Sequence, residues 1–217
     1  LMAALALEDL NENHEPQKLI TQRLGSAPEP DELLLILTRR AKRGDSAAQQ
    51  NLTAQLTDAA TPAGRQLQIA AVLNKEHSEA ASAVLAKAAA ARGPQQVLAA
   101  QLSCSADDPS SLPVLRSAFT DAGRPPYERL LAAQGLGGCG TRKDAGLLAK
   151  ALRDGEKSPL LRQAEAGAIL RLCSGDPDVL SEQSLTWAQA ALTDENWTVR
   201  ESAVAMLGEA DPQRAVP

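Results

Sequence analysis

The sequence predicts an all-α fold, an α-solenoid of about six and a half helix pairs that repeat roughly every 32 residues. Prolines recur at predicted helix starts, with 32 or 33 residues between successive ones. The first turn of a helix tolerates proline because its N–H groups have no partner within the helix. These prolines are Pro30, Pro62, Pro94, Pro126 and Pro159. Alanine is abundant at 41 residues and only 2% of the chain is aromatic, which favours closely packed helices over a β-sandwich.

The helices are expected in pairs, each made of a first helix, a turn and a second helix. Over 30–43, Leu33, Ile36 and Leu37 share one apolar face and Gly44 ends the pattern, so this segment predicts a second helix. The other helices are expected at 1–10, 16–24, 45–56, 62–73, 78–91, 94–103, 110–120, 126–137, 141–152, 159–172, 180–192 and 198–207. We expect residues 1–217 to form a single repeat domain that is a fragment of a longer array, because neither terminal face carries a cap.

Two local patterns concern helix ends. Thr61 precedes a predicted helix and is a candidate N-cap. The segment GLGGCG, 135–140, follows a helix instead of a strand. We therefore interpret its glycines as a helix end with a left-handed residue, and not as a phosphate-binding loop.

An aspartate in the turn before a second helix recurs with an arginine six to eight residues later. The pairs are Asp58 with Arg65, Asp121 with Arg129, Asp154 with Arg162, and Asp194 with Arg200. This pattern, and above all the segment 192–212, resembles the HEAT repeat, particularly the short bacterial HEAT-like type also found in phycobilisome lyases. The resemblance implies a right-handed, armadillo-like α-α superhelix in which these residues form a structural ladder. Asp would cap the second helix, and Arg would bridge its own turn and the neighbouring one.

A repeat array without convergent catalytic residues predicts a non-catalytic scaffold or adaptor that binds a partner protein or peptide through the solenoid surface. The alternative is a phycobilisome-lyase-like factor that handles a tetrapyrrole on a carrier protein. His14 and His77 are the only histidines and lack metal-binding spacing, so we expect no enzyme activity, metal, cofactor or small-molecule ligand. A net charge of −5 and a pI near 5.2 argue against nucleic-acid binding, whose footprint is a basic stripe.

A local basic cluster is the exception to the acidic composition. It comprises Arg39, Arg40, Lys42 and Arg43 at the end of a predicted helix. Cations are favoured there by the helix dipole and usually face water, and the alternative is contact with a phosphate or an acidic partner.

Three cysteines, Cys104, Cys139 and Cys173, lie near the ends of equivalent predicted helices. Stacked helices lie about 8–10 Å apart, whereas a disulfide needs Cα atoms closer than about 7 Å. We therefore expect reduced cysteines in the core. No apolar run reaches the roughly 18 residues of a membrane span, so we expect a soluble, cytoplasmic chain, or a periplasmic one if a signal peptide has been removed.

The two tryptophans, Trp187 and Trp197, are expected in different helices of the last pair. Internal packing of both is the commoner outcome for large aromatic side chains. Trp197 is the better candidate for exposure because it stands at a helix start between Asn196 and Thr198. An exposed tryptophan would be a candidate contact with a partner.

Overall fold

The computed structural model describes residues 30–74, 78–104, 109–155, 158–173 and 180–210. The expected helices at 1–10 and 16–24, and both histidines, lie outside these ranges. Over the described residues the fold is all-α, with eleven α-helices, one short 3-10 helix and no strand, which confirms the predicted class. The elements are α3 (Pro30–Lys42), α4 (Ser46–Thr57), α5 (Ala63–Leu73), α6 (Glu79–Ala90), α7 (Gln96–Cys104), η2 (Pro109–Ser111), α8 (Leu112–Thr120), α9 (Pro126–Cys139), α10 (Arg142–Arg153), α11 (Pro159–Cys173), α12 (Glu182–Ala191) and α13 (Trp197–Gly208). In these ranges no helix combines the length and the apolar character that crossing a membrane requires.

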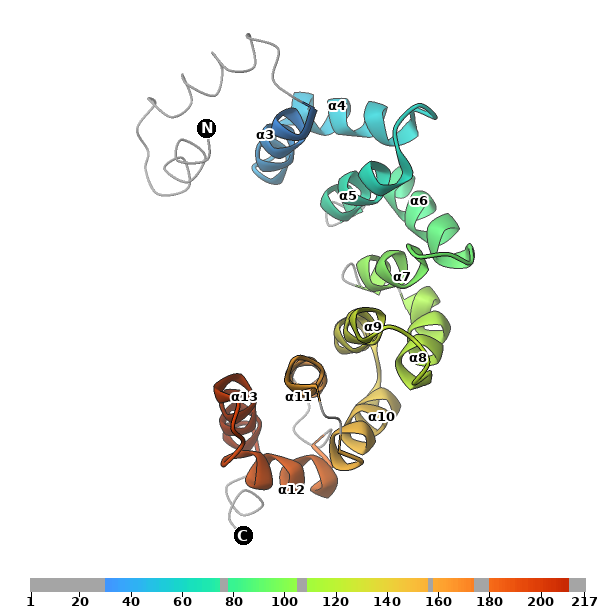
Figure 1. Ribbon diagram of the computed structural model, residues 1–217. Helices are drawn as coiled ribbons and strands as arrows, with labels where there is room; N and C mark the ends of the chain where they lie inside the picture. Colours follow the sequence, from blue (N-terminus) through green and yellow to red (C-terminus); the bar gives the residue numbers. More distant parts are fainter. Residues whose placement is uncertain (1–29, 75–77, 105–108, 156–157, 174–179, 211–217) are drawn as a thin grey trace, which may run out of the picture. The chain divides into compact units, whose positions relative to one another are not determined.

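The chain divides into two compact units, residues 1–82 and 83–217, and α6 begins in the first and ends in the second. In the first unit, α3, α4 and α5 pack against one another (Figure 1). Their shared core contains Ile36, Leu52, Leu56 and Leu67, all buried. Arg65 of α5 also forms an ion pair with Asp31 in the first turn of α3.

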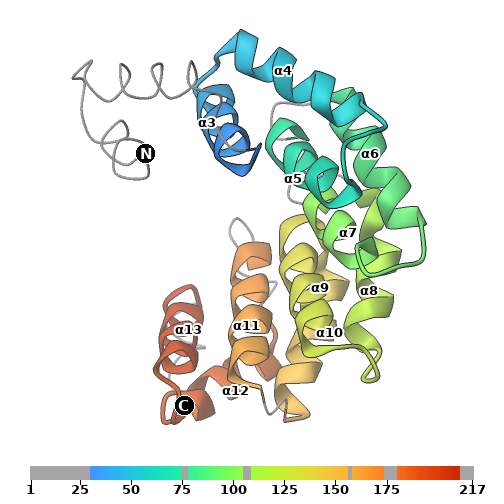
Figure 2. The same ribbon diagram turned by 45° about the horizontal axis from the view of Figure 1, so that its top comes forward.

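In the second unit, each helix packs on helices that lie one or two positions away along the chain. The helices α7, α9, α11 and α13 form one row, in which each contacts the next. Figure 2 shows α9, α11 and α13 side by side. The helices α8, α10 and α12 pack behind this row, each against the helix that follows it. A leucine-rich core, including Leu115, Leu136, Leu148 and Leu161, lies between the two layers.

Local sequence explains most helix boundaries. Pro126 and Pro159 are the first residues of α9 and α11, as predicted. Gly44 adopts φ 82° two residues after the end of α3 and ends the apolar pattern as expected. Thr61, in contrast, is not an N-cap: Pro62 occupies that position in α5 and makes no side-chain cap. Pro62 is extended at ψ 140°, so the helical conformation starts one residue after it, at Ala63.

The interpretation of the segment 135–140 as a left-handed helix end was wrong. Residues 135–139 belong to α9, and Gly140 is extended at φ −73° and ψ −176°. The glycines serve close packing instead. A Cβ on Gly137 would lie 2.6 Å from Ala168 Cα of α11, and a Cβ on Gly135 would lie 3.2 Å from Gln101 Cα of α7. Only residues without a side chain allow α9 to approach both neighbours this closely.

The expectation of reduced cysteines was wrong for two of the three. Cys104 at the end of α7 and Cys139 at the end of α9 form a disulfide, with Cα atoms 5.0 Å apart. The predicted separation assumed ordinary side chains between the helices. Gly135 removes that spacer four residues before Cys139, so the two helix ends come within disulfide range. Cys173 is buried and takes no part in the disulfide, as expected.

Candidate functional site

The start of α11 and the turn before α13 form the best-defined polar site of the second unit. Arg162, in the first turn of α11, donates from Nη2 to both carboxylate oxygens of Asp194, at 3.0 and 2.8 Å. Both side chains are largely shielded, with 18% and 20% of their surfaces exposed. Partial burial makes this ion pair less sensitive to salt than an exposed one. It fixes the start of α11 to the turn that leads into α13.

Asp194 also organises its own turn. The backbone N–H of Asn196 donates to Asp194 Oδ1 at 2.9 Å, and Arg200 Nη1 donates to the carbonyl oxygen of Asp194 at 2.7 Å. Asn196, rather than Asp194, is the N-cap of α13, since its side chain accepts the N–H of Thr198. The turn is therefore held by two arginines, Arg162 of α11 and Arg200 of α13.

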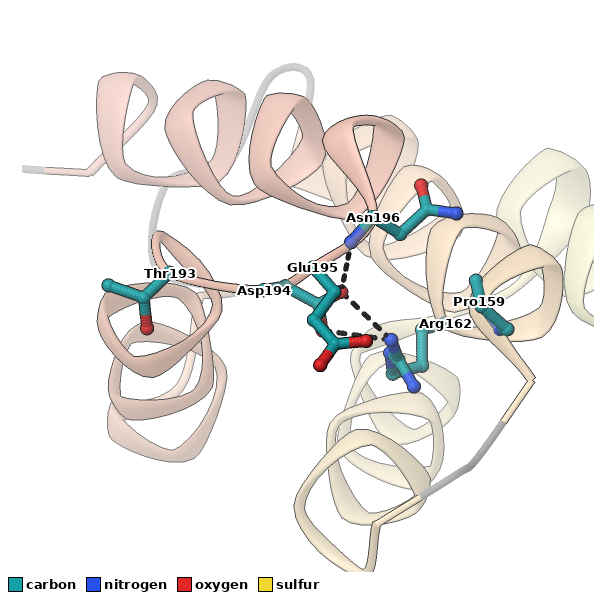
Figure 3. Close-up of a pocket in the computed structure, with 6 residues that line it drawn as sticks. All are labelled: Pro159, Arg162, Thr193, Asp194, Glu195 and Asn196. Atoms are coloured by element: carbon teal, nitrogen blue, oxygen red, sulfur yellow. Dashed lines mark hydrogen bonds and ion pairs between the residues drawn. The ribbon is translucent and has the colours of Figure 1, made fainter.

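A pocket of about 580 Å³ opens at this point (Figure 3). It is lined by Pro159, Arg162, Thr193, Asp194, Glu195 and Asn196. Because Asp194 neutralises Arg162 inside it, the charge that remains in the lining is the carboxylate of Glu195, beside the polar side chains of Thr193 and Asn196. Such a hollow can receive a polar side chain of a partner at the edge of a larger contact.

The other predicted Asp and Arg residues are arranged differently. The predicted ladder comprises four aspartates and four arginines. Among these eight described residues, the structure records an aspartate–arginine ion pair only between Arg162 and Asp194. Arg65 binds Asp31, and Arg129 Nε donates to the carbonyl oxygen of Phe119 at 3.4 Å. Asp58 and Asp121 accept backbone N–H groups within their own turns, from Ala60 and Gly123. Asp154 forms ion pairs with Lys150 and Arg153 of α10.

The helices behind the row carry an ion pair that the sequence pattern did not indicate. Arg116 of α8 binds Asp144 of α10 through two bonds, at 2.6 and 2.9 Å, and the side chain of Asp144 is 2% exposed. Burial raises the pKa of Asp144, but hydrogen bonds from Arg116 and Thr141 outweigh it and hold this pKa below its usual value. A search that compared arginines and acids 28 residues apart in first helices would have found the pair.

Large apolar side chains are exposed at the edge where the second helices begin. Tyr127 is the second residue of α9, Leu160 the second of α11, and Trp197 the first of α13. Their exposed fractions are 63%, 65% and 64%. The three helices pack in parallel, as the Arg162–Asp194 pair and the contact of Gly137 with Ala168 show, so the three side chains share one edge.

The two tryptophans therefore differ. Trp197 is exposed, against the commoner outcome of internal packing, whereas Trp187 is half-buried. Trp187 lines a second hollow of about 440 Å³ between α10 and α12, together with Leu152, Arg153, Glu182, Thr186 and Ala190.

The basic cluster lies at the end of α3, as predicted, and belongs to the first unit. Arg40 Nε binds Asp45 Oδ2 at 2.7 Å, and Asp45 caps α4 by accepting the N–H of Ala48. Lys42 and Arg43 are exposed. Part of the cluster thus stabilises the connection between α3 and α4.

No group of three or more His, Cys, Asp and Glu side chains placed to hold a metal ion occurs within the described ranges. Comparison of the whole sequence with models of known protein families and with curated proteins finds no match.

Proposed function

We propose that this chain is a HEAT-like α-solenoid that acts as a non-catalytic scaffold, and that the second unit binds a partner protein through the edge formed by α9, α11 and α13. The observation that carries the proposal is the row of Tyr127, Leu160 and Trp197. These three large apolar side chains are each more than 60% exposed, and they lie on the parallel, adjacent helices α9, α11 and α13. Only 2% of the chain is aromatic.

The physical argument rests on spacing and on surroundings. Packed helices lie about 8–10 Å apart, so the three side chains span about 20 Å, which is the length of a helix of about 13 residues or of an extended peptide of about six residues. Aromatic and aliphatic anchors of this kind contribute most of the binding free energy at protein interfaces. The polar pocket around Arg162 and Asp194 lies between the last two anchors and provides the hydrogen-bonding rim that such interfaces need.

Site-specific photo-crosslinking tests this function. A photoreactive amino acid placed at Tyr127 or Leu160 should capture the same partner in cell extract, whereas one at Lys143, exposed on α10 in the other layer, should not. Equal capture from Lys143 would contradict the proposed surface.

Purified partner then allows a quantitative measurement. The double variant Leu160→Ala/Trp197→Ala should weaken binding at least tenfold, because each anchor typically contributes more than about 1 kcal/mol. Its melting temperature should remain within about 2 °C of the wild type, since both side chains are mainly exposed. Unchanged affinity would exclude this edge as the binding surface.

The proposal also concerns the cellular compartment in which the protein resides. A disulfide such as Cys104–Cys139 persists in oxidising environments and is rare in the cytosol. This observation favours the periplasmic alternative over the cytoplasmic one. Thiol labelling of the native protein in intact cells checks it: labelling of Cys104 or Cys139 without prior reduction would support the cytoplasm.

A further inference from the structure

The polar pocket between the start of α11 and the turn before α13 lies beside two of the exposed apolar side chains. Pro159, which lines the pocket, is followed in the chain by Leu160. Asn196, which lines the opposite wall, is followed by Trp197. Leu160 and Trp197 are 65% and 64% exposed. A partner side chain in this pocket therefore has an aliphatic and an aromatic neighbour.

The arginines next to the pocket are engaged by acceptors of the protein itself. Arg162 binds both carboxylate oxygens of Asp194. Arg200 Nη1 donates to the carbonyl oxygens of Asp194 and Glu195, at 2.7 and 3.0 Å. Glu195, in contrast, is exposed, and within the described ranges no ion pair involves its carboxylate. Figure 3 shows the Glu195 side chain beside the Arg162–Asp194 pair, so the uncompensated charge of the pocket is negative.

A second exposed acid lies on the other side of Trp197. Glu201 follows Trp197 by four residues, which places it one turn further along the same side of α13. Trp197 thus has Glu195 before it and Glu201 after it. The face of a tryptophan ring attracts cations, and interfaces bring opposite charges together. These surroundings favour a basic group of the partner.

The preceding helices show that a continuation of the chain in the same pattern would leave this site open. Tyr127 of α9 is 63% exposed although α11 packs on α9, and Leu160 of α11 is 65% exposed although α13 packs on α11. A further helix pair that packed on α13 in the same way would therefore leave Trp197 exposed. The pocket itself lies between α11 and the turn before α13, and not on the far side of α13. Its occupant is thus a separate molecule.

We propose that the pocket receives a lysine side chain of the partner, in a segment with apolar residues on both sides of that lysine. This inference rests on the proposed function, because the flanking apolar residues contact Leu160 and Trp197. The ammonium group pairs with Glu195, and its four-carbon stem lies against the ring of Trp197. Lysine fits better than arginine. A guanidinium binds a carboxylate through two parallel bonds, and Arg162 already occupies Asp194, whereas a compact ammonium needs only single acceptors.

Selection of peptides on the purified 217-residue protein tests the inference. A phage-displayed library of random 12-residue peptides should yield sequences with a lysine between apolar residues. Fluorescence anisotropy then measures the affinity of one selected peptide. Glu195→Lys should weaken its binding at least tenfold, and a peptide with glutamate in place of the lysine should recover most of that loss on the variant. The matched control is Glu209→Lys, the same charge change at an exposed residue beyond the other end of α13, which should change affinity less than twofold.

The double variant Leu160→Ala/Trp197→Ala separates this inference from the proposed function. Loss of peptide binding in the double variant, together with unchanged binding in Glu195→Lys, would overturn the lysine site and leave the edge standing. Failure to select any peptide would also overturn the lysine site, whereas partner capture from Tyr127 would still support the edge. Binding that the double variant leaves intact would contradict both.

Two further measurements address the occupant. Equal affinity for the selected peptide and for its lysine-to-arginine version would overturn the assignment of lysine. A chain that ends at Ala210 should bind the selected peptide as the full chain does. Binding more than fivefold tighter would show that residues 211–217 occupy the pocket, and would overturn the proposal of a separate partner.

Discussion

At the scale of single residues, Asp144 joins three interactions in one carboxylate. Its oxygens accept two bonds from Arg116 and the backbone N–H of Thr141, at 2.8 Å, at the start of α10. The side chain combines a helix capping box with an ion pair between two helices. A carboxylate with this many donors is stabilised in its charged form, which explains the lowered pKa.

We predict that Asp144→Asn lowers the free energy of unfolding by about 1–3 kcal/mol at pH 7, the range for a hydrogen bond to a charged group. Because the pKa of Asp144 is depressed in the folded state, its contribution is fully present above the unfolded pKa of about 3.9 and is lost as pH falls through the folded pKa. Urea unfolding should therefore show the difference between wild type and variant shrinking below about pH 4. Asp154→Asn is the control, since Asp154 also has a lowered pKa but lies exposed, and it should have little effect.

Gly137 provides a second prediction at this scale. Gly137→Ala should destabilise the protein by about 1–3 kcal/mol, because the new methyl group would meet backbone of α11 that cannot rotate away. Gly146→Ala in α10 has open space around the new Cβ and should stabilise by about 0.5–1 kcal/mol through helix propensity. Thermal unfolding of both variants measures the contrast. Two stabilised variants would mean that α9 and α11 are not in close contact.

At the scale of elements, the Cys104–Cys139 disulfide connects the ends of α7 and α9 across 35 residues of chain. In the chain-entropy account, closing a loop of this length stabilises the folded state by about 3–4 kcal/mol. We predict that a reductant lowers the urea midpoint of the wild type and leaves a Cys104→Ser/Cys139→Ser variant unchanged. Without reductant, alkylation in denaturant should modify Cys173 alone. Modification of all three cysteines under those conditions would show that the disulfide does not form.

Helix positions followed from local signals, whereas helix contacts did not. Pro126 and Pro159 marked two helix starts correctly because proline fixes φ and needs no N–H partner, so the signal lies within one residue. The disulfide and the role of Gly137 depend on residues more than 30 positions away, whose approach is set by packing. The same reason explains the site. The expected ladder had each arginine bridge its own turn and the neighbouring one, and Arg162 does bind Asp194 of the neighbouring turn. Arg65 and Arg129 instead bind Asp31 and the carbonyl oxygen of Phe119.

At the scale of the whole molecule, the described helices of the second unit contact the helices one or two positions away along the chain, and α12 and α13 pack principally on α10, α11 and each other. A solenoid distributes its stability in this way, as a sum of local terms, whereas a domain with one shared core does not. The two architectures respond differently to truncation.

We predict that a chain ending at Cys173, which lacks α12 and α13, keeps α7, α8 and α9 folded. Truncation uncovers the faces of α10 and α11 that α12 and α13 bury, so these two helices should lose much of their protection against amide hydrogen exchange. The segment from Gln96 to Cys139 should exchange within about tenfold of the full chain, because its contacts and its disulfide are intact. The variant Val204→Asp serves as the control, since Val204 is an exposed residue of α13 and its substitution alters the same end of the unit without removing a helix. Collapse of protection in α7 and α9 after truncation would show a single cooperative core and would contradict the solenoid.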